Sequence, residues 1–217
     1  MPRKNYDKQL EQLNDQMITM GCMIENTISK TIQALAEQNV ELAEEVIASD
    51  YEIDTQERGI EQLCYKLLLT QQPLAGDLRI VSATMKMITD MERIGDHGED
   101  ISELTIRMAG KPYSQEISDI EQMATEATKM VTNSVDAYVN RDMELARAVI
   151  AADDVVDDLF DKVKEKIIEG IRFGKCDGEQ ATDLLMVAKY FERIGDHATN
   201  IAGWVIFSLT GEHGLKQ

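Results

Sequence analysis

The chain has 217 residues, 43% hydrophobic and 29% charged, which is enough for one or two domains with a substantial core. Its 40 Asp and Glu residues against 22 Lys and Arg give a formal charge of -18, which argues against nucleic acid as a partner because phosphate contacts need cationic side chains. Three cysteines, far apart in sequence, argue against a disulfide framework and indicate a reducing compartment. The N-terminal segment has no apolar run typical of a signal peptide, and the longest apolar run, residues 201–209, is too short to span a bilayer. We therefore expect a cytoplasmic protein with no membrane insertion.

Apolar residues recur at spacings of three and four along nearly the whole chain, which is the period of an α-helix. Only 3 prolines are present, and the breaks in the pattern are short and rich in turn-forming residues. These breaks lie at Asn39, 72–73, 110–112, 140–141 and 170–178. They divide the chain into six predicted helices, at 6–38, 40–70, 77–109, 115–140, 142–171 and 179–210. The sequence therefore predicts an all-α protein.

The two halves of the chain are copies of each other. The segment "ELAEEVIASDYEID" at 41–54 returns as "ELARAVIAADDVVD" at 144–157, and "MERIGDHGEDI" at 91–101 returns as "FERIGDHATNI" at 191–201. Two matches in the same order indicate a duplicated three-helix unit, and short connections predict that each unit is an antiparallel bundle. We expect two tandem three-helix bundles, residues 1–110 and 111–217.

Each copy of the second repeated segment carries a row of oxygen-bearing side chains along one helix. Because each helical residue advances ~100°, the row of the first copy lies about 120–160° from the core residue Ile94 and is expected to point away from the core. Like charges four residues apart cost about 0.2–0.5 kcal/mol per pair, so a row without interleaved Lys or Arg is typical of a site for a hard cation such as Mg²⁺, Mn²⁺, Ca²⁺ or ferric iron. The row residues are Glu92, Asp96 and Asp100 in the first copy and Glu192, Asp196 and Asn200 in the second.

The preceding helices add a second pair of acids to each copy. Asp50 and Asp54 lie at the edge of an apolar stripe, and Asp153 and Asp157 repeat them. From that edge they could help to hold the same ion, although periodicity leaves open whether they meet the rows. Glu99 has no acidic counterpart in the second copy and is expected on the surface. One acid pair alone is more often a solvated helix face, and the repetition of the pairs is what favours a metal site.

The remaining residues of the repeated motif are expected to serve packing. His97 and His197 lie about 100° around the helix from the neighbouring aspartates, so they are off the rows. Gly95 and Gly195 lie in the middle of predicted helices, where glycine costs about 1 kcal/mol against alanine. We expect these glycines to allow close approach of another helix or of a ligand.

The sequence lacks the short motifs of several common classes of enzyme. The chain contains no HExxH, CxxC, G-x-S-x-G or P-loop sequence, and its Glu-to-His spacing of five differs from the Glu-x-x-His of di-iron bundles. A carboxylate-bridged oxidase or phosphatase would explain the acids equally well but would lack histidine ligands and a nucleophile. The sequence therefore favours a protein that is not an enzyme.

The segments "DMERIGDHGEDI" (90–101), "YFERIGDHATNI" (190–201) and "QQPLAGDLR" (71–79) resemble the signature segments of the PhoU family, regulators of phosphate signalling in bacteria and archaea. The resemblance covers essentially the whole chain, including its length and its duplication. It implies two three-helix bundles side by side and a negative regulator of phosphate uptake and of the phosphate-starvation response.

The resemblance also implies partners and a cofactor. Members of the family contact the cytoplasmic part of a phosphate-sensing histidine kinase and the ATPase subunit of the phosphate ABC transporter, which implies peripheral association with the membrane. Some members bind multinuclear metal clusters, so iron or zinc joins Mg²⁺ and Mn²⁺ as a candidate here. By position the ligands are the ten residues of the two rows and the two aspartate pairs. A homodimer, and regulation of a different transporter, are left open.

Overall fold

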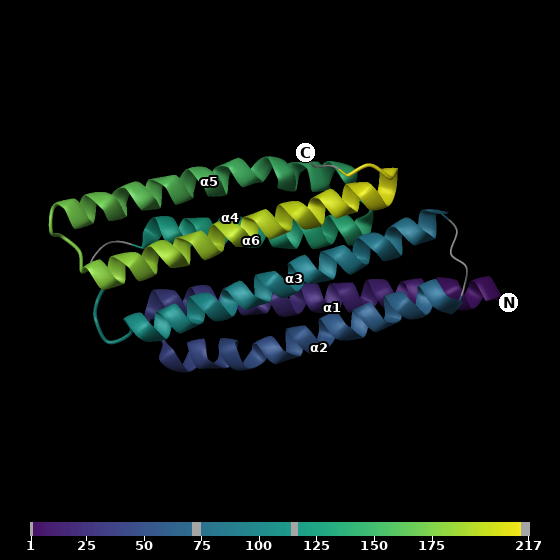
Figure 1. Cartoon of the computed structure of the whole chain (residues 1–217), viewed down its shortest axis with the longest axis horizontal. Coiled ribbons are helices and arrows are strands. Elements are labelled where there is room, and N and C mark those ends of the chain that lie inside the picture. The colour runs from purple at the N-terminus through teal and green to yellow at the C-terminus, as the bar shows by residue number, and fades with distance from the viewer. Residues whose placement is uncertain (1, 71–74, 114–116, 214–217) are drawn as a thin grey trace.

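The computed structural model describes residues 2–70, 75–113 and 117–213, and within these ranges it contains six α-helices and no strand (Figure 1). The helices are α1 (Pro2–Glu37), α2 (Val40–Thr70), α3 (Ala75–Met108), α4 (Ser118–Asn140), α5 (Met143–Arg172) and α6 (Gly178–Thr210). The predicted all-α class is confirmed. The turn expected at residues 72–73 lies outside the described residues.

The helices form two antiparallel three-helix bundles that lie side by side along their length, α1–α3 in one layer and α4–α6 in the other (Figure 1). Within each bundle every helix packs against the other two. Across the bundles α3 packs against α6 and α1 packs against α4, whereas the described parts of α2 and α5 contact only their own bundle. The predicted pair of bundles is confirmed, and the boundary between residues 110 and 111 stays a prediction.

The helix ends follow from local chemistry. Arg141 has φ +53° and Gly110 has φ +84°, so both adopt the left-handed conformation that terminates a helix. Asp142 is the N-cap of α5, and its side chain accepts hydrogen bonds from the backbone N–H groups of Glu144 and Leu145, each at 3.0 Å. Asp177 is the N-cap of α6, and its side chain accepts a hydrogen bond from the backbone N–H of Glu179. The connections from α4 to α5 and from α5 to α6 are therefore short, as the break pattern predicts.

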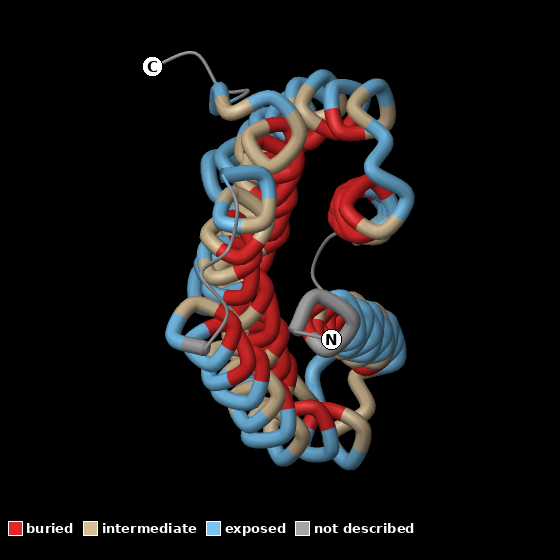
Figure 2. Tube along the Cα trace, turned by 90° about the vertical axis from the view of Figure 1, so that its right-hand side faces the viewer, coloured by how far each residue is buried: buried red, intermediate tan, exposed pale blue. Residues whose placement is uncertain are grey.

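The core consists of apolar side chains, which the spacing by three and four places on one side of each helix. Viewed along the long axis, buried positions line the inside of the assembly and exposed positions the outside (Figure 2). Methionines contribute heavily, and their flexible side chains suit the gaps between helices of different spacing. Fully buried ones include Met17, Met20, Met87, Met91 and Met123. Within the described ranges, none of the helices combines the length and apolarity needed to cross a bilayer.

Candidate metal-binding acid clusters

Gly95 is the point at which α2 approaches α3. A Cβ atom at this position would lie 3.0 Å from Ile53 Cδ1 and 3.3 Å from Asp50 Oδ1, both on α2. Ile53 is buried, so the missing side chain at Gly95 lets an apolar residue of α2 pack directly on the α3 backbone. The helix whose close approach the sequence left open is α2, and its approach brings Asp50 beside the acid row of α3.

We call the acids at this junction the first acid cluster; its predicted members are Asp50, Asp54, Glu92 and Asp96. Burial raises the pKa of Glu92 to about 7, and the neighbouring Asp96 adds to the effect. Burial also raises the pKa of Asp50, with Asp96 and Asp54 as further causes. Carboxylates from two helices therefore share one partly buried region, where the charges of Asp96 and Asp54 make ionisation of Asp50 and Glu92 less favourable.

The expectation that the rows point away from the core into solvent fits only part of each row, since Asp100 is 40% exposed and Asp196 is exposed. The side chains of Glu92 and Asp96 are only 19% and 29% exposed, because α2 covers this side of α3. An angle measured around one helix does not show which neighbour lies over it. The acids line the seam between two helices of one bundle, where a cation would be more strongly attracted than on an open surface.

Two arginines lie at the outer edge of the first cluster. Arg93 Nη1 donates to Asp96 Oδ2 at 2.7 Å, and its Nε lies 3.5 Å from Glu92 Oε2. Arg58 Nη2 lies 3.5 Å from Asp54 Oδ2. Both arginine side chains are more than half exposed, so their charges are screened by water and neutralise the cluster incompletely.

Two further acids belong to the first cluster and were missed. Burial raises the pKa of Glu99, which Asp50 and other acids raise further, although Glu99 was expected on the surface. Burial and the acids Glu61 and Asp54 raise the pKa of Glu57. Glu57 lies three residues after Asp54 and Glu99 three residues after Asp96, so spacing by three as well as by four was the signal that could have found them.

The second acid cluster repeats the arrangement between α5 and α6; its members are Asp153, Asp157, Glu192 and Asp196. A Cβ atom at Gly195 would lie 3.5 Å from Asp153 Oδ1, so this glycine admits α5 as Gly95 admits α2. Burial raises the pKa of Asp153 to about 6, with Asp196 and Asp157 as further causes. Eight of the ten predicted ligands thus gather in two equivalent places.

Asp100 and Asn200, the other two predicted ligands, face the seam between the bundles. Asn200 Nδ2 donates to Asp90 Oδ1 at 3.3 Å, and His197 Nδ1 lies 2.9 Å from the same oxygen. Asp100 Oδ2 lies 3.3 Å from Nδ1 of the buried His97. Both residues therefore bind partners at the α3–α6 interface, separate from the contacts that join each row to its aspartate pair.

The histidines of the two motifs meet at that interface, where the sequence predicted only a helix-surface or packing role. The ring of His97 lies 5.5 Å from that of His197 and 5.3 Å from that of Tyr190, measured between centroids. Burial lowers the pKa of His97. Two copies of one motif thus meet face to face and hold the bundles together.

The donor set fits a hard cation in chemistry, although the arrangement is open. The clusters offer oxygen ligands only, and Asp50 Oδ1 is buried without a hydrogen-bond partner. Within the described ranges, no three His, Cys, Asp or Glu side chains stand close enough together to hold a metal ion as they are arranged. Binding would therefore require the carboxylates to close by side-chain rotation.

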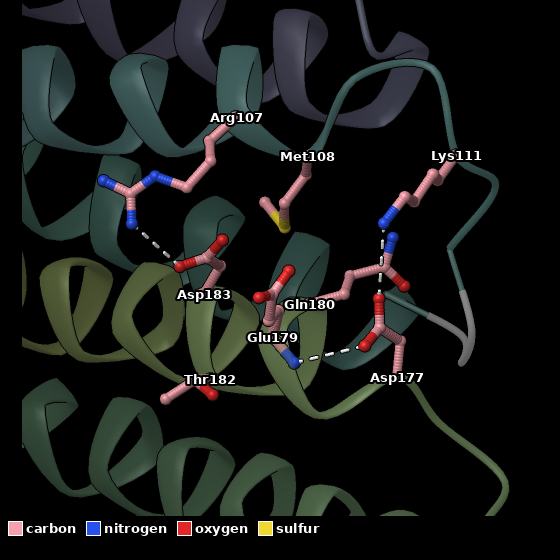
Figure 3. A pocket seen from close by; sticks show the side chains of 8 residues that line it. All are labelled: Arg107, Met108, Lys111, Asp177, Glu179, Gln180, Thr182 and Asp183. Carbon is pink, nitrogen blue, oxygen red and sulfur yellow. Dashed lines mark hydrogen bonds and ion pairs between the residues drawn. The ribbon is translucent and has the colours of Figure 1, made fainter.

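A pocket of about 380 Å³ lies away from both clusters, where the end of α3 meets the start of α6 (Figure 3). Two ion pairs lie in its lining. Arg107 Nη1 lies 3.2 Å from Asp183 Oδ1, and Lys111 Nζ lies 3.7 Å from Asp177 Oδ2. With three acidic and two basic side chains in its lining, the pocket carries a smaller excess of negative charge than the acid clusters.

Comparisons with known proteins agree with this architecture. The family model for the PhoU domain matches residues 17–105 and 120–205, one match in each bundle. A phosphate-specific transport system accessory protein PhoU homolog from Clostridium acetobutylicum is 36% identical over 213 residues, covering 98% of this chain and 97% of that protein. The homolog of the same name from Aquifex aeolicus is 38% identical over 205 residues, covering 94% of this chain and 93% of that protein.

Solved structures show the same fold. The crystal structure of PhoU from Pseudomonas aeruginosa has a TM-score of 0.90 at 27% identity and covers 95% of this chain and 99% of that one. That of the phosphate transport system regulatory protein PhoU from Streptococcus pneumoniae has a TM-score of 0.91 at 25% identity, covering 97% and 100%. With the family model, the full-length relatives and the duplicated bundles in agreement, this chain belongs to the PhoU family.

Proposed function

We propose that this protein is a non-catalytic regulator of phosphate uptake that links a phosphate-sensing histidine kinase to the ATPase subunit of a phosphate ABC transporter. The observation that carries the proposal is identity of more than 30% over nearly the full length to proteins named as phosphate transport accessory proteins. Those names describe accessory components, which favours an adaptor over an enzyme. Such a protein would act by binding one conformation of its partner more tightly than another.

The acid clusters are proposed to bind cations in support of this function. A bound Mg²⁺, Mn²⁺, iron or zinc ion would supply positive charge that neutralises carboxylates from two helices. The residues that would hold it are Asp50, Asp54, Glu92 and Asp96 in the first cluster, with Asp153, Asp157, Glu192 and Asp196 as the second set. Because these acids come from adjacent helices, neutralisation would tie α2 to α3 and fix the outer surface of the bundle.

Binding of cations predicts a change in stability. After chelator treatment, Mn²⁺ should raise the midpoint of thermal unfolding, since a ligand that binds only the folded state stabilises it. The double variant Asp50→Asn/Asp96→Asn, which keeps the shape of both side chains, should lose the part of this increase that the first cluster supplies. Glu52→Gln, an exposed change on α2, is the matched control and should keep it. An unchanged midpoint with Mg²⁺, Mn²⁺, Fe³⁺ and Zn²⁺ would remove cation binding from the proposal.

The adaptor role is tested with the partners themselves. Tagged wild-type protein from phosphate-replete cells should retain the transporter ATPase and the kinase, and Glu52→Gln should retain them equally. Deletion of the gene should derepress a phosphate-starvation reporter, and wild type should restore repression. Absence of both partners from the wild-type sample, together with an unchanged reporter in the deletion strain, would refute the adaptor role. Phosphatase or oxygen-consuming activity of the Mn²⁺- or iron-loaded protein would instead favour the metalloenzyme.

A further inference from the structure

The second acid cluster contains a lysine where the first has a threonine. The ERIGDH motifs repeat with an offset of 100, so Lys189 is the equivalent of Thr89, one turn before the row. Lys189 Nζ forms an ion pair with Glu192 Oε2, and the Glu192 side chain is only 14% exposed. The hydroxyl of Thr89 donates to the carbonyl oxygen of Met85 on its own helix, at 3.5 Å. The two clusters therefore differ in charge at equivalent positions.

The neighbouring helix differs in the same direction. The segments of α2 and α5 repeat with an offset of 103, which makes Phe160 the equivalent of Glu57 and Lys164 the equivalent of Glu61. Lys189 Nζ lies 5.3 Å from the centroid of the Phe160 ring, within the range of a cation–π contact. Lys164 Nζ lies 5.5 Å from the same centroid. Where α2 has the acids Glu57 and Glu61, α5 has an aromatic ring and a lysine, and two ammonium groups lie near that ring.

The charge of Lys189 extends over most of the second cluster. Burial raises the pKa values of Asp157 and Asp196, and Lys189 acts against that effect at both. With the Glu192 ion pair, its ammonium group thus acts on three of the four acids. In the first cluster the guanidinium groups of Arg58 and Arg93 stay at the exposed edge, so no tethered cation occupies the seam among the described side chains.

We propose that Lys189 is a built-in counter-ion that takes the place of a metal ion in the second cluster, so that the chain loads cations at the first cluster only. The inference rests on the cation binding of the proposed function. A divalent ion entering the second cluster would first have to displace an ammonium group that is held by a poorly solvated carboxylate and by an aromatic ring. In the first cluster the competing charges are the guanidinium groups of Arg58 and Arg93, which are more than half exposed, and the additional acids Glu57 and Glu99 lie nearby.

Equilibrium dialysis of the chelator-treated chain against Mn²⁺ tests this assignment. Lys189→Thr should bind about twice as much Mn²⁺ per chain as wild type, because it opens a second oxygen-ligand site. The reciprocal variant Thr89→Lys should lose most of the wild-type binding. Lys129→Thr is the matched control, since Lys129 makes an i,i+3 pair with Glu126 at 2.8 Å on α4 with 59% of its side chain exposed, and it should bind as wild type does.

The outcomes separate the two proposals. Equal Mn²⁺ binding by wild type and Lys189→Thr would overturn the assignment of Lys189 while leaving cation binding intact. An equal increase in Mn²⁺ binding by Lys129→Thr would likewise overturn it, because removal of any lysine would then have the same effect. If neither wild type nor Lys189→Thr binds Mn²⁺, cation binding itself fails and the inference fails with it. Circular dichroism of each variant confirms that a changed stoichiometry is measured on folded protein.

Discussion

Replacing Glu92 by glutamine should stabilise the chelator-treated protein above neutral pH. Burial between α2 and α3, with the charge of Asp96 beside it, raises the pKa of this carboxyl from 4.5 to about 7 in spite of Arg93. The folded protein therefore holds a proton on Glu92 more tightly than the unfolded chain does. Glutamine has nearly the same shape and no charge to desolvate.

The sign and size follow from proton linkage. The contribution of Glu92 to stability is full below about pH 4.5 and is lost as the pH rises through about 7. At 1.36 kcal/mol per pH unit, the difference between the two pKa values amounts to about 3 kcal/mol. Glu92→Gln should recover up to this amount near pH 8, or about 6–12 °C in the unfolding midpoint for a chain of this size. Near pH 4 the variant and wild type should unfold alike.

Urea and thermal unfolding with a chelator present, at several pH values between about 4 and 8, measure this difference. Glu52→Gln, the exposed control on the same pair of helices, should show no pH-dependent gain. A gain that is the same at both ends of the pH range would refute the linkage argument. A Glu92→Gln protein less stable than wild type near pH 8 would refute the claim that the cluster is poorly compensated.

Three further changes test packing and polar contacts. Gly98→Ala should cost about 1–3 kcal/mol in urea unfolding, because its Cβ atom would lie 2.8 Å from a side chain of α1. Gly59→Ala, where a Cβ atom would have nothing within 4 Å, should stabilise the protein by about 0.5–1 kcal/mol. Equal effects of the two substitutions would contradict the contact between α3 and α1. Asp119→Asn should cost about 1–3 kcal/mol at neutral pH. Burial alone would raise the pKa of Asp119, but its two lysine partners on α5 hold that pKa below its ordinary value of 3.8. The stabilisation by the ionised carboxylate is therefore lost as the pH falls, and a cost of the substitution that does not depend on pH would refute the pairing. Tyr138→Phe should cost about 1 kcal/mol by removing a buried 3.0 Å hydrogen bond between α4 and α3, and no loss in calorimetric stability would show that the bond contributes nothing.

The sequence predicted the helices because their causes are local. A period of three and four, few prolines and clear breaks placed all six, and most ends lie within a few residues of the observed ones. The exceptions are at the N-terminus, where α1 begins at Pro2 and not at residue 6, and at α4, which begins at Ser118 and not at residue 115. Ile94, from which the angle of the first row was measured, is buried as predicted.

The candidate site was predicted less completely because its geometry depends on neighbours. Periodicity gives the angle of Glu92 around α3 but not the helix that covers it, so the row was expected in solvent. Periodicity alone also placed Asp100 and Asn200 in the rows, whereas in the structure they contact groups of the α3–α6 interface. Glu99 was set aside because it lacks a repeat, although its side chain approaches Asp50 from the facing helix. Whether any of these residues binds metal stays a prediction.

The meeting of His97 and His197 at the α3–α6 interface shows how the repeats have diverged. Asp90, which holds His197, is equivalent to Tyr190, which stacks on His97, so the two halves complete the same joint with different partners. A homodimer of single bundles would have to use one residue type for both tasks. Duplication within one polypeptide freed each copy to mutate independently, and a molecule of this kind can present unlike faces to unlike proteins while keeping one continuous backbone.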